Sequence, residues 1–234
     1  MNNTTLRKIL TWCVFPVIIV VLVLLIISSI MKPVNFNKEQ AAREAVAIQR
    51  LKDIRTLQNA YKAETMKFTG SIDTLIAFYN AGSMTITMQI GSLDDSAAVA
   101  HTDKVKKALR LGKGDNEKLY QLYQEGDSQL VFSVTTKLPV RDTLFKSREN
   151  FCIDSIATIP FSGGEPVIME SVVRLVSGVN VPLFEAKMPY KLLLKGMDNQ
   201  LRINLDAAKR DQNRYEGLQV GSVTAPNNNA GNWE

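Results

Sequence analysis

The sequence contains few of the residues that form metal sites and disulfide frameworks. Two cysteines and one histidine occur in 234 residues. Cys13 lies within an apolar run and Cys152 lies far along the chain, so we expect no disulfide between them, and no Cys-x-x-Cys spacing is present. His101 has neither a cysteine nor a second histidine near it in the sequence. A zinc site or a catalytic triad would depend on this one imidazole, so we expect no metal site.

Motifs of catalysis and of nucleotide binding are also missing. The sequence has no Gly-x-Gly-x-x-Gly fingerprint and no Gly-x-Ser-x-Gly turn, and Gly112-Lys113-Gly114 lacks the spacing of a phosphate-binding loop. Asp94-Asp95 lacks the spacing of the oxygen ligands in a calcium loop. The net charge of +5 is too small to indicate a nucleic acid partner. We therefore expect a protein that is not an enzyme, has no cofactor and does not bind nucleic acid.

One long apolar run stands out in what the sequence does contain. Residues 9–31 carry no charge over 23 positions. As an α-helix this run would be about 34 Å long, which is enough to cross a hydrocarbon core of about 30 Å. The hydrophobic part of a signal peptide is typically about 7–15 residues long and ends at small residues, whereas Met31-Lys32-Pro33 follows here. We interpret the run as a retained single-pass transmembrane helix, a signal anchor.

Basic residues flank the apolar run on both sides. Arg7 and Lys8 precede it, and Lys32 and Lys38 follow it, so a count of positive charges does not decide the orientation. A short basic tail before a single hydrophobic span most often stays in the cytoplasm. We therefore expect residues 1–8 to be a cytoplasmic tail at the bacterial inner membrane, with the bulk of the chain in the periplasm.

Residues 32–82 are expected to form a long amphipathic helix followed by a short capping helix. Asn37, beyond Pro33, is placed to cap the start of the long helix. Apolar residues recur at helical spacing on one side: Ala47, Ile48, Leu51, Ile54, Leu57 and Tyr61. Charged residues occupy the other side: Arg50, Lys52, Asp53 and Arg55. The apolar stripe predicts packing against a folded body, and a short coiled coil with a second copy is the alternative.

A turn is expected to end the long helix. Phe68-Thr69-Gly70 stops it, with Gly70 free to take positive φ, and Ser71 caps a second helix that ends near Gly82. Three stretches carry the pattern: Ala60-Tyr61, Lys67-Phe68-Thr69-Gly70-Ser71 and Ile72-Asp73-Thr74-Leu75. Together with the apolar run, these stretches resemble the N-terminal half of type IV pilins and pseudopilins.

The resemblance implies both a fold and a role. It implies a membrane helix that continues into an amphipathic helix packed on a small antiparallel sheet, and a structural role in an envelope assembly. Prepilins carry a glycine-ended leader and a glutamate inside the apolar segment. The apolar run here contains neither residue type, so no prepilin-peptidase site is expected.

Residues 83–224 are expected to form an antiparallel α+β head. Residues 84–90 and 130–136 read as strands, and a basic helical insertion at 102–126 separates them. Four cations of the insertion are candidate contacts with a partner, an anionic lipid or a polyanion: Lys104, Lys106, Lys107 and Arg110.

The later strands are expected to include a hairpin. Its arms are residues 167–176 and 179–186, with the turn at Ser177-Gly178. Pro182 places the second arm at a sheet edge or a bulge, because proline has no N–H for a strand ladder.

The C-terminal part is less regular in pattern. A short helix opens at Tyr190, residues 201–208 fit a strand or a helix, and residues 217–223 fit a last strand. Residues 225–234 are polar and low in complexity, which predicts a disordered tail, with Trp233 as a candidate docking residue.

These patterns predict an α+β protein with one transmembrane helix that continues into a long amphipathic helix packed on a mainly antiparallel sheet. The favoured function is that of a pseudopilin-like structural or assembly component. Its expected partners are the lipid bilayer and other envelope proteins, or a second copy through the amphipathic helix. The alternative is a tethered module that binds a polymer, a peptide or an anionic lipid at the membrane surface.

Overall fold

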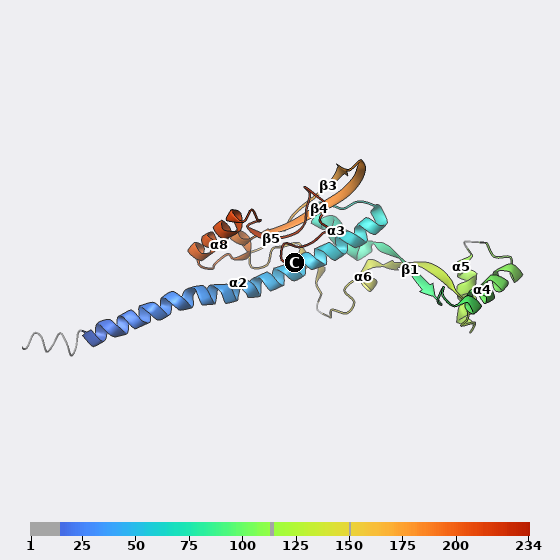
Figure 1. Cartoon of the computed structure of the whole chain (residues 1–234), viewed down its shortest axis with the longest axis horizontal. Coiled ribbons are helices and arrows are strands. Elements are labelled where there is room, and N and C mark those ends of the chain that lie inside the picture. Colours follow the sequence, from blue (N-terminus) through green and yellow to red (C-terminus); the bar gives the residue numbers. More distant parts are fainter. Residues whose placement is uncertain (1–14, 113–114, 150) are drawn as a thin grey trace, which may run out of the picture. The chain divides into compact units, whose positions relative to one another are not determined.

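The computed structural model describes residues 15–112, 115–149 and 151–234 (Figure 1). The expected cytoplasmic tail and the first part of the apolar run lie outside these residues. The described chain is a mixture of helices and antiparallel strands, which confirms the predicted α+β class.

The residues that the structure describes fall into two compact units. Unit 1 comprises residues up to Thr56, Gly70–Ile72 and Asp154–Glu234, and unit 2 comprises Leu57–Thr69 and Asp73–Ile153. Helix α2 contributes to both.

Helix α2 spans Phe15–Thr65 without a break. The predicted cap at Asn37 is wrong, because this residue lies inside the helix. Pro33 also lies inside it. Proline lacks an N–H, so the carbonyl of Ser29 has no partner one turn along, but the remaining hydrogen bonds continue the helix on both sides.

The surface of α2 changes along its length. Residues 15–32 are all exposed, although nearly all of them are apolar. From Phe36 onward, one side of the helix is buried: Phe36, Ala47, Leu51, Ile54, Leu57 and Ala60. The solvent-exposed side of α2 is narrower than predicted, because some of the charged residues assigned to it are not exposed. Asp53 is 4% exposed and accepts a hydrogen bond from Gln49, and half-buried Arg50 donates to the carbonyl of Thr158 at 2.6 Å.

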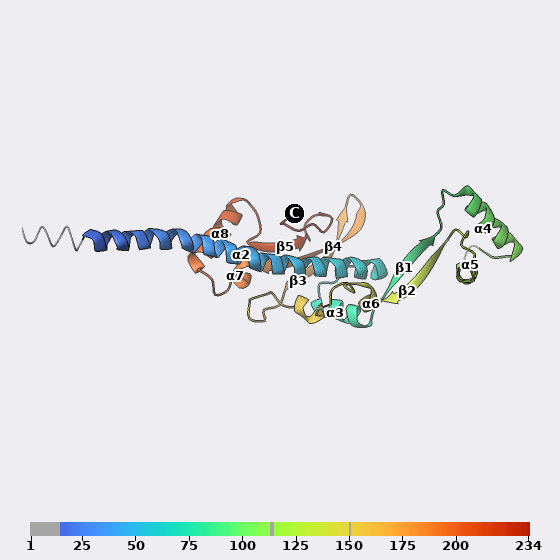
Figure 2. The ribbon, with the colours of Figure 1, turned by 90° about the horizontal axis from the view of Figure 1, so that it is seen from below.

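Unit 1 contains a three-stranded antiparallel sheet beside α2 (Figures 1 and 2). Its order is β3 (Ile168–Val176), β4 (Val179–Pro189) and β5 (Gly217–Gly221). Ser177 and Gly178 both have positive φ, 50° and 83°. Two such residues form the type I′ turn that matches the twist of a hairpin, so the predicted hairpin is confirmed.

Strand β4 is central in this sheet, yet Pro182 still lies at a local edge. Pro182 pairs with Val173 of β3. Strand β5 pairs only with Glu185–Pro189, so the other side of β4 has no partner strand at Pro182. The missing N–H therefore costs no ladder hydrogen bond on that side.

Two helices follow β4 in unit 1. Helix α7 spans Tyr190–Leu193, and the stretch that fitted either a strand or a helix is helix α8, Asn199–Asp211. Asp198 caps α8, because its carboxylate accepts hydrogen bonds from the backbone N–H groups of Gln200 and Leu201 at 3.0 and 3.1 Å.

The C-terminal tail is ordered, so the prediction of a disordered tail is wrong. Gly231 forms an antiparallel bridge with Val220 of β5. The side chain of Asn232 accepts from the N–H of Gln219 and donates to the carbonyl of Gly217. The side chain of Asn232 thus extends the hydrogen bonding of β5. The polar, low-complexity composition of the tail does not indicate such a contact.

Unit 2 begins with the end of α2 and the turn beyond it. The residue at positive φ in this turn is Met66 (60°), not Gly70. The buried side chain of Gln58 holds the turn, because it donates to the carbonyl of Thr69 at 2.5 Å and accepts from its N–H at 3.1 Å. Helix α3 (Ile72–Ala81) follows, as predicted.

An antiparallel ribbon forms the next part of unit 2. It pairs β1 (Ser83–Ile90) with β2 (Phe132–Pro139), which confirms both predicted strands. Helices α4 (Ser96–Ala108) and α5 (Asn116–Gln124) lie between them in sequence, so the insertion is helical as expected, but α4 begins before the predicted range of 102–126. The short helix α6 (Val140–Thr143) follows in unit 2, and η2 (Ile153–Ile156) begins at the last residue of unit 2 and belongs mostly to unit 1.

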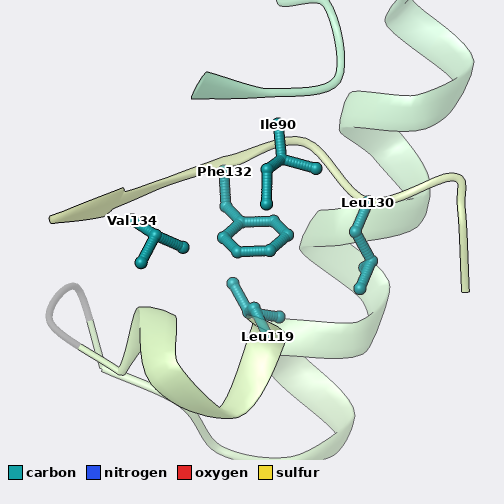
Figure 3. Close-up of a cluster of buried hydrophobic side chains, with 5 residues drawn as sticks. All are labelled: Ile90, Leu119, Leu130, Phe132 and Val134. Atoms are coloured by element: carbon teal, nitrogen blue, oxygen red, sulfur yellow. The ribbon is translucent and has the colours of Figure 1, made fainter. Parts of the chain in front are cut away.

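A small hydrophobic cluster joins the β1–β2 ribbon to helices α4 and α5 (Figure 3). The ring of Phe132 lies between Ile90, Leu130 and Leu119 of α5. Buried Thr102 of α4 adds a polar contact, because its hydroxyl accepts from the N–H of Val131 at 2.8 Å. The insertion therefore folds onto the strands that it interrupts.

Candidate functional site

The apolar part of α2 is the first functional feature. Among the described residues, α2 is the one helix that is long and apolar enough to cross a membrane. Its apolar segment is not buried in the protein. A helical segment of this length and composition can cross a bilayer.

The four predicted contact cations lie at the end of α4 in unit 2. Lys104, Lys107 and Arg110 are exposed and Lys106 is half-buried. Arg110 follows the helix at a positive φ of 52°. Cations in the last turn of a helix are stabilised by its dipole, which gives Lys106 and Lys107 a role in stabilising α4 itself.

His101 has a partner in the same unit. Its Nε2 lies 2.9 Å from Oδ2 of Asp127, and this hydrogen bond is the main cause that lowers the pKa of the Asp127 carboxyl. Among the described residues no three His, Cys, Asp or Glu side chains gather into a possible metal site. The pair links α4 to the turn after α5.

Trp233, the remaining predicted contact residue, packs on its own chain. Its indole lies so close to Gly231 that a Cβ there would come within 2.3 Å of the ring. The indole Nε1 is buried and has no hydrogen-bond partner among the described residues.

An ion pair fastens the tail beside Trp233. Nη1 of Arg55 lies 2.7 Å from Oε1 of Glu234 and donates to the carbonyl of Asn229 at 3.3 Å. The hydrogen bond from Arg55 is the largest cause that lowers the pKa of Glu234. Arg55 was predicted to lie on the solvated side of α2, and the pairing could not be found without the position of the tail.

The largest group of charges that the sequence analysis missed lies on α8. Arg202 pairs with Asp206 at 2.5 Å, and Arg210 pairs with Glu216 at 2.7 Å. A cavity of about 590 Å³ opens between these residues, Lys191 and Arg214. Four cations and two acids line it, so the cavity favours an anion. The spacing of 202, 206 and 210 is a helical signal that the undecided assignment of this stretch concealed.

Asp206 is the most unusual residue of this cavity. It is 7% exposed, and its Oδ1 is buried without a hydrogen-bond partner among the described residues. Burial is the main cause that raises its pKa. Burial also raises the pKa of Tyr190, and the nearby Glu44 carboxylate raises it further.

Comparison of the chain with known protein families, with curated protein sequences and with solved structures finds no match. The resemblance to pilins and pseudopilins therefore depends on the motif residues in the first half of the chain.

Proposed function

We propose that the chain is a membrane-anchored, non-enzymatic structural or assembly component of the bacterial cell envelope, similar to pseudopilins, that acts through protein–protein contacts. The observation that carries this proposal is the change of surface along α2. One helix exposes an apolar segment long enough to span a bilayer and then buries one side of its continuation in a folded head.

The proposed location is the inner membrane. Residues 1–8 face the cytoplasm and the bulk of the chain lies in the periplasm, in keeping with the short basic tail before the apolar run.

Two surfaces of α2 are available for partners. The stripe that contains Leu51 and Ile54 is covered by the chain itself, so self-association does not use it. The apolar segment remains exposed to neighbours in the bilayer, and beyond it Val46 is 41% exposed. Other envelope proteins or a second copy are the proposed partners.

In-cell photocrosslinking of the full-length protein tests this function. A photoreactive residue at Val46 should yield a defined adduct with an envelope protein or a second copy, whereas one at buried Leu51 should yield only intramolecular products. A protein that fractionates with membranes and gives no adduct from Val46 or from exposed positions of the apolar segment would contradict an assembly role.

The second candidate is a tethered binding module, favoured by one observation. Lys104, Lys107 and Arg110 are exposed and form no ion pair with a described residue. Charge reversal at these positions together with Lys106 should abolish binding of a polyanion or an anionic vesicle if this candidate is correct. A structural component should keep its crosslinked partner in the same variant.

A further inference from the structure

The point where α2 leaves its apolar segment is sharply defined. Ile30 and Met31 are 60% and 46% exposed, and Val34 is 50% exposed, whereas Phe36 is 7% exposed. The distance along the helix from Met31 to Phe36 is about 7.5 Å at the usual rise per residue. The helix thus passes from a surrounding lipid to a protein contact within little more than one turn.

The loop between α7 and α8 lies against this point (Figures 1 and 2). A cavity of about 320 Å³ is lined by Lys32, Asn35, Phe36 and Glu39 of α2 and by Met197 and Asp198 of the loop. A bilayer has a hydrocarbon core of about 30 Å within a total of about 40–45 Å, which leaves about 5–7 Å of headgroups on each side. Met197 and Asp198, at the end of the loop beside Lys32, therefore lie at the level of the headgroups when α2 spans the bilayer, whereas the carbonyl of Lys195 lies farther along α2, where it accepts a hydrogen bond from Arg43.

A second cavity continues from the same loop. It has a volume of about 390 Å³ and shares Met197 with the first. Three cations line it, Lys191, Lys195 and Arg202, together with the half-buried side chains of Leu192 and Met197. No described acidic side chain lines it. Cations beside apolar side chains suit a ligand with an anionic head and an apolar body.

The cations of this cavity retain donors for a ligand. Lys191 is exposed and forms no ion pair with a described residue. Lys195 uses one N–H of its ammonium on the carbonyl of Ser162, at 2.9 Å. Arg202 makes three hydrogen bonds, to Asn199 and Asp206, and an arginine has five N–H donors, so two remain.

We propose that this cavity, the headgroup cavity, binds the phosphate of an anionic phospholipid from the bilayer that holds α2. The proposal rests on the proposed function, because it requires the apolar segment to span a membrane. Lys191 and Lys195 contact the phosphate from one side and Arg202 from the other. Leu192 and Met197, which are both half-buried, face the glycerol and the first methylenes of the acyl chains. Bound lipid fixes the head at the membrane surface.

Reconstitution of the full-length protein tests the proposal. Vesicles contain phosphatidylcholine alone or with phosphatidylglycerol, and each lipid is supplied in turn with a photoreactive group near its phosphate. We expect adducts on residues 190–202 with phosphatidylglycerol. Lys191→Glu should lower their yield by about fivefold or more, since one cation near an anionic surface contributes about 1 kcal/mol. Lys118→Glu makes the same charge change on exposed α5 and should leave the yield unchanged.

Three results would overturn the lipid site. Equal adducts with both lipids, or equal yields from Lys191→Glu and the original chain, would show that the cavity does not select an anionic headgroup. Competition by inorganic phosphate at millimolar concentration would assign the cavity to a soluble anion instead. Flotation of the vesicles separates the two proposals: protein that fails to float refutes the anchor, and protein that floats without selective adducts refutes the headgroup cavity alone.

Discussion

The two halves of α2 have the same backbone structure and opposite surfaces. Between Phe15 and Met31 the apolar side chains surround the helix and are all exposed. Between Phe36 and Ala60 most of the large apolar side chains follow one side and are buried, although Val46 is exposed. The first half is apolar on every side, whereas the second half has one apolar side and one polar side.

This difference shows that the environment suited to each half depends on how the apolar residues are distributed around the helix, and not on their number. An apolar surface on all sides suits hydrocarbon, where the helix satisfies its own backbone groups. A stripe suits a protein core on one side and water on the other. Four predictions test or sharpen the comparison, from the largest expected effect to the smallest.

Charges in the first half should abolish anchoring. Leu22→Arg combined with Leu25→Arg places two cations where hydrocarbon is expected, at a cost of about 2.5–3.5 kcal/mol each. We expect the variant to leave the membrane fraction in flotation and carbonate extraction, while circular dichroism shows a folded head. Leu22→Ile with Leu25→Ile is the control and should stay anchored. A double-arginine variant that floats like the control would contradict the assignment of this half to lipid.

Removal of a buried side chain in the second half should destabilise the head. Leu51→Ala should lower the free energy of unfolding of unit 1 by about 2–5 kcal/mol, because Leu51 is fully buried. Denaturant titration in detergent, followed by the fluorescence of Trp233 in a Trp12→Phe background, measures the change. Leu22→Ala removes the same atoms from the exposed half. If the two substitutions cost the same, the halves do not differ as described.

Loss of the Gln58 side chain should loosen the turn that ends α2. Gln58→Ala removes both hydrogen bonds to the backbone of Thr69 and should destabilise unit 2 by about 1–3 kcal/mol. Hydrogen exchange at residues 66–72 should rise more than exchange in β1. Lys38→Ala, at an exposed position of the same helix, is the control. Unchanged protection of the turn in Gln58→Ala would show that the turn is held by other contacts.

Acid should release the tail, with the smallest effect of the four. The pKa of Glu234 is lowered from 4.5 by the hydrogen bond from Arg55, so its carboxylate stabilises the folded tail above that pH. The stabilisation is lost as the pH falls through the lowered pKa. Trp233 fluorescence should change in this range, and Arg55→Ala should remove the pH step while Lys38→Ala keeps it. An identical step in Arg55→Ala would assign it to another group.

Much of the fold follows from local pattern. Alternation predicted β1, and Ser177-Gly178 predicted the turn of the β3–β4 hairpin, because both signals depend on a few adjacent residues. The stripe with Leu51 and Ile54 predicted the buried side of α2. Each of these features is set by the spacing of side chains along one element, which a single sequence contains.

The errors share a different cause. Three predictions rest on neighbours in sequence alone: the helix start at Asn37, the solvated position of Arg55 and the disordered tail. The structure at each of these places depends on residues that are distant in sequence. Arg55 and Glu234 are joined only when the tail pairs with β5, and the cavity of about 590 Å³ requires three segments, 189–191, 202–210 and 214–216. The headgroup cavity could not be inferred until the α7–α8 loop was placed against Phe36.

Pro33 makes α2 easier to bend at one defined position. The carbonyl of Ser29 lacks its helical partner there, so α2 is less stiff between its exposed apolar segment and its buried stripe than on either side. A pulling or sideways force on the head would bend the helix at Pro33 before it disturbed the packed stripe. In the proposed function, the apolar segment can thereby tilt with the bilayer while the folded part keeps its internal structure.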